Sequence, residues 1–450
     1  MGMGIKQARI RNSILTGLVF LSFFLSYKLW TAGRNIGEET TSGQVTRTTA
    51  SSITHYQNDA FRPIEVVKHE EERVDTVLIS HTYPLRNLWR QTIDERMFDQ
   101  LIRSEMKDIN QYIEELQNGD WLEYVFLEEV PFGINEQNFD ELSREATNTF
   151  YNRMLININD QSQVYFYNTE TEIYHVVSVL EEQELNIEAY LNQENLPYVE
   201  ATPYIIGDNI IYISTNPITI PYKSYVIDQL SNTIYINSFF PDTSLVDVRS
   251  NGNLTRYIDL TKEVSINENT ETLNYLRQIS DSSDVDPTTR YLRSFDQVNR
   301  FENWADTFVL SDYNRVDQTI SFRRELDGIL VFSQNDYESV TDITIVESGV
   351  TRLKLPLRFI RTPIAIPEMD ENGDSSTLIA GTTLMEDIQS KVLPETYNKI
   401  EDVTIGYTWI ESEENSQVVN FSPEWYILVD GTWMTYNSLL RLQEDEMNGF

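Results

Sequence analysis

The chain of 450 residues contains no cysteine and only four histidines. A disulfide framework, a thiolate metal site and a cysteine nucleophile are therefore excluded. The histidines are scattered without an H-E-x-x-H pattern, at His55, His69, His81 and His175. We therefore expect no zinc site, no Ser-His-Asp triad and no cofactor.

Cations are also few, with 34 lysines and arginines against 71 acids and a formal net charge of −37. The first 37 residues carry five cations and no acid, which leaves −42 on the rest. Nucleic-acid binding requires cations that neutralise phosphates, so we expect no nucleic-acid partner. Solubility through charge repulsion is one explanation of this acidic charge. Binding of divalent cations or of a cationic partner is the alternative explanation.

Long apolar runs are absent except for one, Ile14 to Leu29, with the sequence ILTGLVFLSFFLSYKL. Counted from Asn12 to Trp30, the run is long enough to span a membrane. Three cations precede it: Lys6, Arg9 and Arg11. Cations on this side predict a cytoplasmic N-terminus, a single-pass anchor in the cell membrane and an extracellular remainder. A cleaved signal peptide is the alternative, but Trp30 stands where cleavage requires a small residue.

The composition after the anchor predicts packed domains, because apolar residues make up 40% of the chain and aromatic residues 12%. We predict a cytoplasmic tip and anchor over 1–34 and a flexible Thr/Ser-rich linker over 35–55. Three α+β domains are expected to follow, over 56–240, 241–362 and 363–450.

In the first domain, apolar residues at spacings of three and four predict a long helix from Leu88 to Leu116. A second amphipathic helix is predicted from Phe139 to Phe150. Short strands are predicted over 121–126, 164–167 and 210–213.

In the second domain, Asp286 is a natural N-cap and Pro287 suits the first position of a helix that continues to Phe301. Strands are predicted over 319–323, 329–333, 343–346 and 350–360. Asp327-Gly328 predicts a hairpin turn between the first two strands.

The third domain repeats this order. Thr383 and Glu386 match a capping box, and Pro394 should end the helix that they begin. Strands are predicted over 403–410, 418–421, 425–429 and 433–436, with a hairpin turn at Asp430-Gly431. The last two domains are therefore predicted to share one plan, a helix followed by an antiparallel sheet.

Several segments now carry a family resemblance. They are the basic N-terminus, an anchor ending in Ser26-Tyr27-Lys28-Leu29-Trp30-Thr31, the run Gly406-Tyr407-Thr408-Trp409 and the run Ser422-Pro423-Glu424-Trp425-Tyr426. In layout and in these motifs the chain resembles the YycH (WalH) family. None of the motifs is catalytic, so we expect no enzymatic activity.

The resemblance implies a membrane-anchored accessory protein of the WalK/WalR (YycG/YycF) two-component system of low-GC Gram-positive bacteria. It also implies a smaller YycI-like partner and contact with a WalK/YycG-like sensor kinase through transmembrane helices. The pathway controls cell-wall metabolism. The sign of the effect on the kinase differs between genera and does not transfer to this chain.

The anchor contains two pairs of small residues at a spacing of four, Ser13 with Gly17 and Ser22 with Ser26. Small residues let helix backbones approach each other in lipid. At about 100° per residue the two pairs lie on nearly opposite faces. We therefore predict that one face contacts the kinase and the other contacts the YycI-like helix; small residues without a role are the alternative.

Other motifs favour structural explanations. Residues 370–374 resemble a calcium loop, but Ser375 stands at the sixth position, where glycine is required, and Gly381 stands at the twelfth, where glutamate is required. Ser104 with Lys107 matches S-x-x-K without a following K-T-G. Glu181-Glu182 and Glu413-Glu414 are expected on solvated faces, although paired acids also occur in glycosidases. Four aromatic residues near the C-terminus are expected to pack as cross-strand pairs: Trp409, Trp425, Trp433 and Tyr436. The alternative function is an extracellular binding module for cell-wall glycan or peptide, and a carboxylate-based wall hydrolase is the third class.

Overall fold

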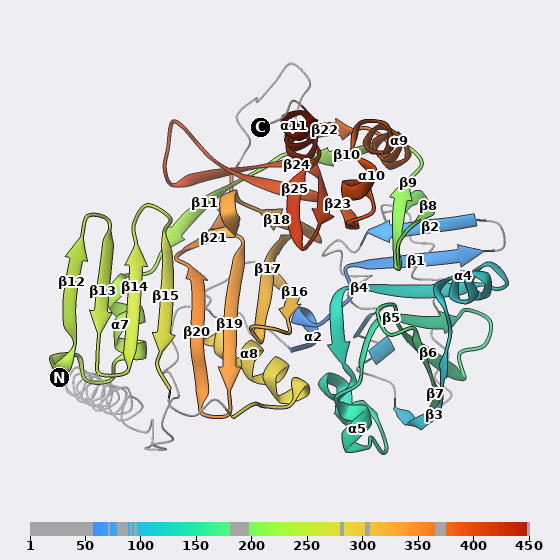
Figure 1. The fold of residues 1–450 in the computed structure, drawn as a ribbon, viewed down its shortest axis with the longest axis horizontal. Helices are drawn as coiled ribbons and strands as arrows, with labels where there is room; N and C mark the ends of the chain where they lie inside the picture. The colour runs from blue at the N-terminus through green and yellow to red at the C-terminus, as the bar shows by residue number, and fades with distance from the viewer. Residues whose placement is uncertain are drawn as a thin grey trace, which may run out of the picture. The chain divides into compact units, whose positions relative to one another are not determined.

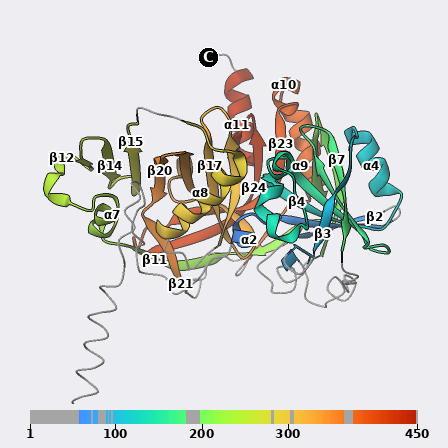
Figure 2. The ribbon, with the colours of Figure 1, turned by 90° about the horizontal axis from the view of Figure 1, so that it is seen from below.

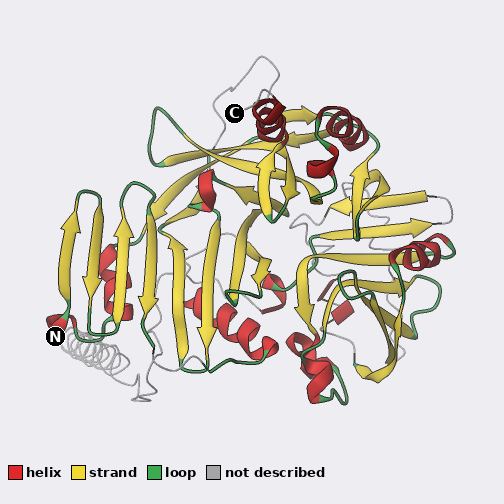
Figure 3. Ribbon diagram, in the orientation of Figure 1, coloured by secondary structure: helices red, strands yellow, loops and turns green. Residues whose placement is uncertain are grey.

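The computed structural model describes residues 57–70, 73–78, 89–90, 92–93, 97–180, 198–279, 283–301, 307–364 and 375–447. All of them belong to the second of two compact units, Met1–Gln44 and Val45–Phe450. Most of this part of the chain forms β-strands, with helices between them (Figure 3). The predicted mixed α+β class is therefore confirmed. No helix within the described ranges is long and apolar enough to cross a membrane, and the predicted anchor and linker lie outside those ranges.

Two large sheets organise the described residues (Figure 1). The nine-stranded sheet has the order β3-β7-β6-β5-β4-β1-β2-β8-β9. Its strands are β1 (Glu65–Glu70), β2 (Arg73–Leu78), β3 (Phe98–Met106), β4 (Trp121–Pro131), β5 (Phe150–Asn157), β6 (Gln163–Asn168), β7 (Ile173–Val179), β8 (Tyr198–Ile206) and β9 (Asn209–Ser214).

The fourteen-stranded sheet has the main order β12-β13-β14-β15-β20-β19-β17-β18-β23-β24-β11-β21, with β16 paired to β17 and β25 paired to β24. Its strands are β11 (Lys223–Gln229), β12 (Asp247–Asn251), β13 (Leu254–Ile258), β14 (Lys262–Asn267), β15 (Thr272–Arg277), β16 (Thr307–Asn314), β17 (Thr319–Leu326), β18 (Ile329–Phe332), β19 (Val340–Val346), β20 (Gly349–Pro356), β21 (Arg358–Pro363), β23 (Ile400–Glu411), β24 (Val418–Val429) and β25 (Thr432–Thr435). A separate pair joins β10 (Ile218–Pro221) to β22 (Ser375–Leu378).

The described α-helices are α2 (Gln57–Ala60), α4 (Ile109–Gln117), α5 (Arg144–Thr147), α7 (Asn232–Phe239), α8 (Pro287–Phe301), α9 (Gly381–Lys391), α10 (Pro394–Tyr397) and α11 (Tyr436–Met447). Short 3-10 helices are η1 (Phe132–Asn138), η2 (Thr243–Leu245) and η3 (Gln334–Asp336). α8 packs on the fourteen-stranded sheet against β19 (Figure 2).

The helix predicted from Leu88 to Leu116 is wrong over most of its length. The structure has strand β3 over Phe98–Met106 and a shorter helix, α4, that begins at Ile109. Asp108 caps α4 by accepting from the backbone N–H of Asn110 at 2.9 Å and of Gln111 at 3.0 Å. The spacing in β3 is that of a helix, but pairing with the distant strand β7 decides its conformation.

The helix predicted from Phe139 to Phe150 is also wrong. Only α5, four residues long and capped by Ser143, is helical in this span, and Phe150 begins β5. Phe139 has an extended backbone and packs against Phe98 with ring centroids 5.2 Å apart. Phe139, Leu142 and Phe150 face a core from loops and a strand, so their helical spacing was coincidental.

The local signals of the central segment are confirmed. Helix α8 begins at Pro287, and Asp286 accepts a hydrogen bond from the backbone N–H of Thr289 at 3.0 Å. β17 and β18 form a hairpin across Asp327-Gly328, and β24 and β25 form one across Asp430-Gly431. The predicted strand 350–360 is divided into β20 and β21, and the strands predicted over 418–421 and 425–429 are one strand, β24.

The predicted capping box of Thr383 and Glu386 is wrong. A helix capped by Thr383 would begin at residue 384, but α9 begins three residues earlier, at Gly381, and its N-cap Ala380 makes no side-chain capping bond. Instead, the backbone N–H of Gly381 donates to Ser214 Oγ at 3.0 Å. A distant strand residue thus supplies the acceptor, which local sequence patterns do not reveal.

Strand β9 connects two hydrophobic cores because its side chains alternate between its faces. Ile210 and Tyr212 pack into a core with α4 and the nine-stranded sheet. Ile211 and Ile213 pack into a core with α9 and the fourteen-stranded sheet. The two sheets are therefore joined by a strand that is buried on both faces.

The order of helix and then strands occurs both in the central segment and in the last one. The strands of both segments belong to one sheet, because β18 pairs in parallel with β23 and β11 lies between β24 and β21. The domain boundaries at 240 and 362 stay predictions.

Candidate functional site

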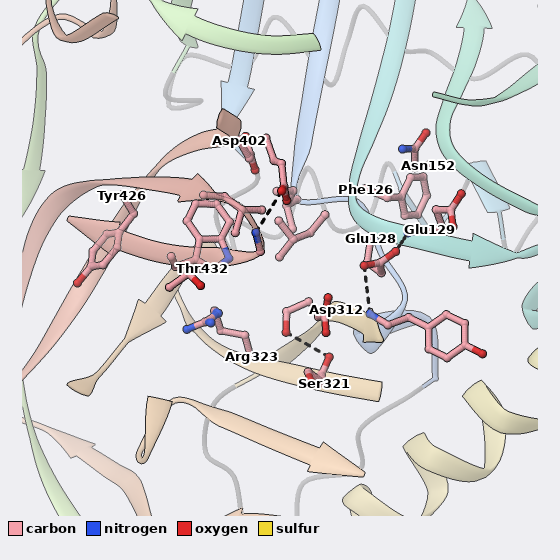
Figure 4. Close-up of a pocket in the computed structure, with 18 of the residues that line it drawn as sticks. Phe126, Glu128, Glu129, Asn152, Asp312, Ser321, Arg323, Asp402, Tyr426 and Thr432 are labelled. Atoms are coloured by element: carbon pink, nitrogen blue, oxygen red, sulfur yellow. Dashed lines mark hydrogen bonds between the residues drawn. The ribbon is translucent and has the colours of Figure 1, made fainter. Parts of the chain in front are cut away.

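A cleft of about 1000 Å³ lies where strands of the two large sheets meet. The nine-stranded sheet contributes residues of β1, β4, β5 and β9, and the fourteen-stranded sheet contributes residues of β16, β17, β18, β23 and β24. Figure 4 shows the side chains of Glu128 and Asp312 on one side of this cleft and Asp402 on another. A volume of this size is typical of ligand sites.

The cations that line the cleft are already paired. Arg315 bonds Glu129 and lies 3.3 Å from Glu170. Arg323 donates to both oxygens of Asp336, at 2.7 and 3.1 Å. Two further pairs complete the set: Lys354 lies 3.6 Å from Asp342, and Arg153 lies 3.4 Å from Glu123. The cleft therefore offers no unpaired positive charge among its described side chains.

Five carboxylates of the cleft form no ion pair with any described lysine or arginine: Glu65, Glu128, Asp312, Glu401 and Asp402. Glu128 accepts from the backbone N–H groups of Glu129 at 2.8 Å and Tyr313 at 3.1 Å. Glu401 accepts from the N–H of Gly431 at 3.1 Å. These backbone bonds fix the side chains without neutralising them.

Burial changes the charge that these groups carry. It raises the pKa of Glu65 from 4.5 to about 8, helped by the nearby charge of Asp402. Burial likewise raises the pKa of Glu128 to about 8 and that of Asp402 to about 6. At neutral pH the two glutamates are therefore mainly protonated, and each can donate a hydrogen bond.

A second buried network lies behind Arg153, centred on Glu123, which is 0% exposed. Glu123 accepts from Tyr112 OH at 2.8 Å and from Tyr212 OH, and it lies 2.8 Å from His69 Nε2. Burial opposes its ionisation, but the contacts with His69 and Arg153 outweigh burial and lower its pKa. The network holds α4, β1, β4, β5 and β9 together.

An aromatic wall borders the cleft. The rings of Phe332 and Tyr426 are stacked with centroids 3.8 Å apart, and the guanidinium of Arg323 lies 4.4 Å from the centre of the Phe332 ring. Gly406 makes the stack possible, because a Cβ there would lie 2.3 Å from Phe332 Cε2. Thr408 Oγ1 and Tyr426 OH are 2.7 Å apart.

The two motifs near the C-terminus that carried the family resemblance contribute to this aromatic wall. Gly406-Tyr407-Thr408-Trp409 lies in β23 and pairs with Ser422-Pro423-Glu424-Trp425-Tyr426 in β24. Tyr407 OH donates to the carbonyl of Pro221 at 2.8 Å, and Trp425 Nε1 donates to the carbonyl of Ile379 at 3.0 Å. The motifs therefore position strands and do not supply reactive groups.

The predicted transmembrane contact residues lie outside the described residues: Ser13, Gly17, Ser22 and Ser26. So do the calcium-like segment 370–374 and the pair Glu181-Glu182. Within the described ranges, no group of three or more His, Asp or Glu side chains is arranged to hold a metal ion.

Three other motifs have structural explanations. Ser104 lies in β3, not in a helix, and its Oγ is 2.7 Å from His175 Nδ1. Glu413-Glu414 is an exposed loop, as expected. Cross-strand packing is confirmed for three of the four aromatic residues, since Trp409, Trp425 and Trp433 lie opposite residues of paired strands. It is wrong for Tyr436, which begins helix α11.

Sequence reasoning did not find the cleft. Its only sequence signal is charge within otherwise apolar strands, as at Glu128-Glu129 in β4. The carboxylates come from strands that are distant in the sequence, and only the tertiary structure brings them to one cleft.

Two family models match the chain. The YycH protein N-terminal domain matches residues 8–196, and the YycH protein C-terminal domain matches residues 208–444. The curated protein "Two-component system WalR/WalK regulatory protein YycH" of Bacillus subtilis (strain 168) is 20% identical over 95% of both chains.

Solved structures give the same result for the fold. The crystal structure of YycH from Bacillus subtilis matches with a TM-score of 0.67 and 14% identity, covering 88% of this chain and 99% of that chain. The Bacillus megaterium YpeB C-terminal domain reaches a TM-score of only 0.22, from which nothing is inferred.

Proposed function

The chain belongs to the YycH family, and on that basis we propose that it regulates a sensor histidine kinase of the WalK/YycG type. The observation that carries the proposal is the match to a WalR/WalK regulatory protein over 95% of both chains. The family consists of regulatory accessory proteins and not of enzymes. The regulated pathway would be cell-wall metabolism.

The proposed topology is a single-pass anchor at Ile14–Leu29, with a cytoplasmic N-terminus and an extracellular three-domain part. The cations before the run and its length support this topology. The acidic charge of the remainder fits a soluble extracytoplasmic part. The last two domains would share their helix-plus-sheet plan within one continuous sheet.

The proposed contact with the kinase runs through the anchor. Ser13 with Gly17 would form one face, and Ser22 with Ser26 the other, since small residues allow close helix packing in lipid. One face would bind the kinase and the other a YycI-like accessory protein. The described part of the chain would add contacts outside the membrane.

Co-purification of the intact protein from membranes tests this proposal. We expect recovery of a sensor kinase and of a second single-pass protein, with Gly17→Leu losing one of them and Ser22→Leu the other. Leu21→Ile, an apolar exchange in the same run, is the control. Failure of the unchanged protein to recover any kinase would refute the regulatory role. Unchanged recovery by both variants would refute only the two-face contact.

The cleft favours a second candidate, an extracellular binding module for cell-wall glycan or peptide. Protonated Glu65 and Glu128 can donate hydrogen bonds to a polar ligand. Recovery of muropeptides without a kinase in the same co-purification would support this module in place of the regulator.

A further inference from the structure

Strand β12 is an open edge of the fourteen-stranded sheet. It pairs with β13 on one side, and no strand in the described part of the chain pairs with its other side. It is the outermost strand of this sheet at the left of Figure 1. All five of its residues, Asp247–Asn251, are exposed, and Val248 is 54% exposed.

Two other outer strands of the large sheets carry features that block pairing. At the opposite edge of the same sheet, β21 contains Pro363 and the two cations Arg358 and Arg361, and its register shifts beside Val226. In the nine-stranded sheet, the edge strand β3 has two register shifts against β7. Proteins use such prolines, cations and bulges to prevent edge-to-edge association.

β12 differs from these two edges. It contains no proline and no lysine, and its register with β13 is regular throughout. Its single cation, Arg249, is neutralised by Asp247, which accepts from Arg249 Nε at 2.8 Å. The edge is therefore chemically suited to receive another strand.

The hairpin geometry determines which backbone groups face outward. β12 and β13 are joined by the two-residue loop Gly252-Asn253, with Asn251 opposite Leu254. The residues that flank such a loop hydrogen-bond each other, and bonded and non-bonded pairs then alternate along the hairpin. The N–H and C=O groups of Val248 and Ser250 consequently point away from β13, toward the open side.

We propose that this edge pairs with the same edge of a second copy of the chain, antiparallel and with Val248 opposite Val248 of the second copy. In this register the outward-facing N–H and C=O groups of the two strands can hydrogen-bond to each other. It places Asp247 opposite Arg249 of the second copy, and Arg249 opposite Asp247 of the second copy. The strand is thus complementary to itself, as a two-fold symmetric contact requires.

Neighbouring registers lack this complementarity. A pairing centred on Arg249 also joins outward-facing groups, but it places the two Arg249 side chains opposite each other. A shift by a single residue would oppose outward-facing groups with inward-facing ones. Opposite charges directly across a strand pair stabilise it, whereas like charges destabilise it.

The contact is short, so its affinity in free solution should be low. Copies anchored in one membrane meet at a much higher effective concentration, which favours a weak contact. This pairing is independent of the proposed kinase regulation, and each can fail without the other.

Cysteine crosslinking of the full chain in lipid vesicles tests the register, because the chain has no cysteine of its own. Val248→Cys should give a disulfide-linked dimer, since hydrogen-bonded antiparallel residues have Cα atoms about 5.5 Å apart, within disulfide range. Ser250→Cys is the matched control on the same edge, where the two Cα atoms would be about 14 Å apart along the strand. Equal crosslinking of the two variants, or none at Val248→Cys, would overturn the proposal.

A charge exchange in the Val248→Cys background tests whether the partner is the same edge of a second copy of the chain. Asp247→Arg alone and Arg249→Asp alone should each lower the crosslinked fraction several-fold, because like charges then face each other. An equimolar mixture of the two should restore it, because every opposed pair is again of opposite charge. Both positions are exposed, so an unchanged thermal midpoint will confirm folding. Full crosslinking by either single variant would contradict the self-pairing.

Discussion

Glu123 is a buried carboxylate whose neighbours supply the donors that it needs. Tyr112, Tyr212 and His69 all lie within hydrogen-bond distance of its oxygens, and Arg153 lies 3.4 Å away. A buried charge is tolerated only when it is paired and hydrogen-bonded in this way. The donors come from a helix and three strands, so a single carboxylate connects much of the nine-stranded sheet.

Tyr212→Phe removes one of these donors without changing the shape of the side chain. We expect a loss of about 1.5–3 kcal/mol in the free energy of unfolding, the range for a hydrogen bond to a charged group. Tyr257→Phe, in the half-buried strand β13, is the control and should have little effect. Urea denaturation measures both. Equal stability of the two variants would show that the Tyr212 hydroxyl contributes nothing.

The cleft glutamates predict a pH dependence of stability. The pKa values of Glu65 and Glu128 are raised from 4.5 to about 8, so between these values the folded protein binds more protons than the unfolded chain. Stability should therefore fall as the pH rises from about 4.5 to about 8. The double variant Glu65→Gln/Glu128→Gln should flatten this fall, whereas Glu413→Gln on the exposed loop should not. Denaturation midpoints measured across this pH range test the prediction. Parallel curves for the unchanged chain, the double variant and the Glu413→Gln variant would refute it.

At the scale of single elements, β23 and β24 show how a motif that serves packing and not catalysis can identify a family. Gly406 leaves the space in which Phe332 and Tyr426 stack, and β18 joins β23 in parallel at this point. A larger residue would force the ring stack apart.

Gly406→Ala should cost about 1–3 kcal/mol of stability, as is typical of overpacked cores. The cost should be smaller in the background of Phe332→Leu, because the smaller side chain leaves room for the added methyl group. A double-mutant cycle measured by chemical denaturation tests this coupling. Additive effects would indicate that the clash is relieved elsewhere.

The elements also show which features were predictable from the sequence. Helix α8 and the turns at Asp327-Gly328 and Asp430-Gly431 depend on caps and turn residues within a few positions, and these predictions were correct. Strand β3 and the start of α9 depend on distant partners, β7 and Ser214, and these predictions were wrong. Local chemistry thus determines turns and caps, while non-local pairing decides ambiguous apolar segments.

For the whole molecule, strand β9 is the connection between the two large sheets. Its side chains reach the core around α4 on one face and the core around α9 on the other. The cleft lies where the same sheets meet, so its carboxylates could not be grouped from the sequence: Glu65 and Asp402 come from opposite ends of the described chain. A change at the cleft would act on both sheets at once.

This arrangement suits a regulatory accessory protein of the YycH family. The family match and the acidic charge of the chain agree with a protein that acts by contact. The proposed anchor would deliver that contact to the kinase. Exchange of residues 1–34 for an unrelated anchor separates the two parts, because retained regulation would place the active contact in the folded part.

The most direct measurement is the phosphorylated fraction of the response regulator in cells that lack this protein and in cells that carry it again. We expect the fraction to differ between the two strains and to return to its original level when the intact chain is restored. The double variant Gly17→Leu/Ser22→Leu should fail to restore it at equal protein abundance. An identical phosphorylated fraction with and without the protein would contradict the regulatory role.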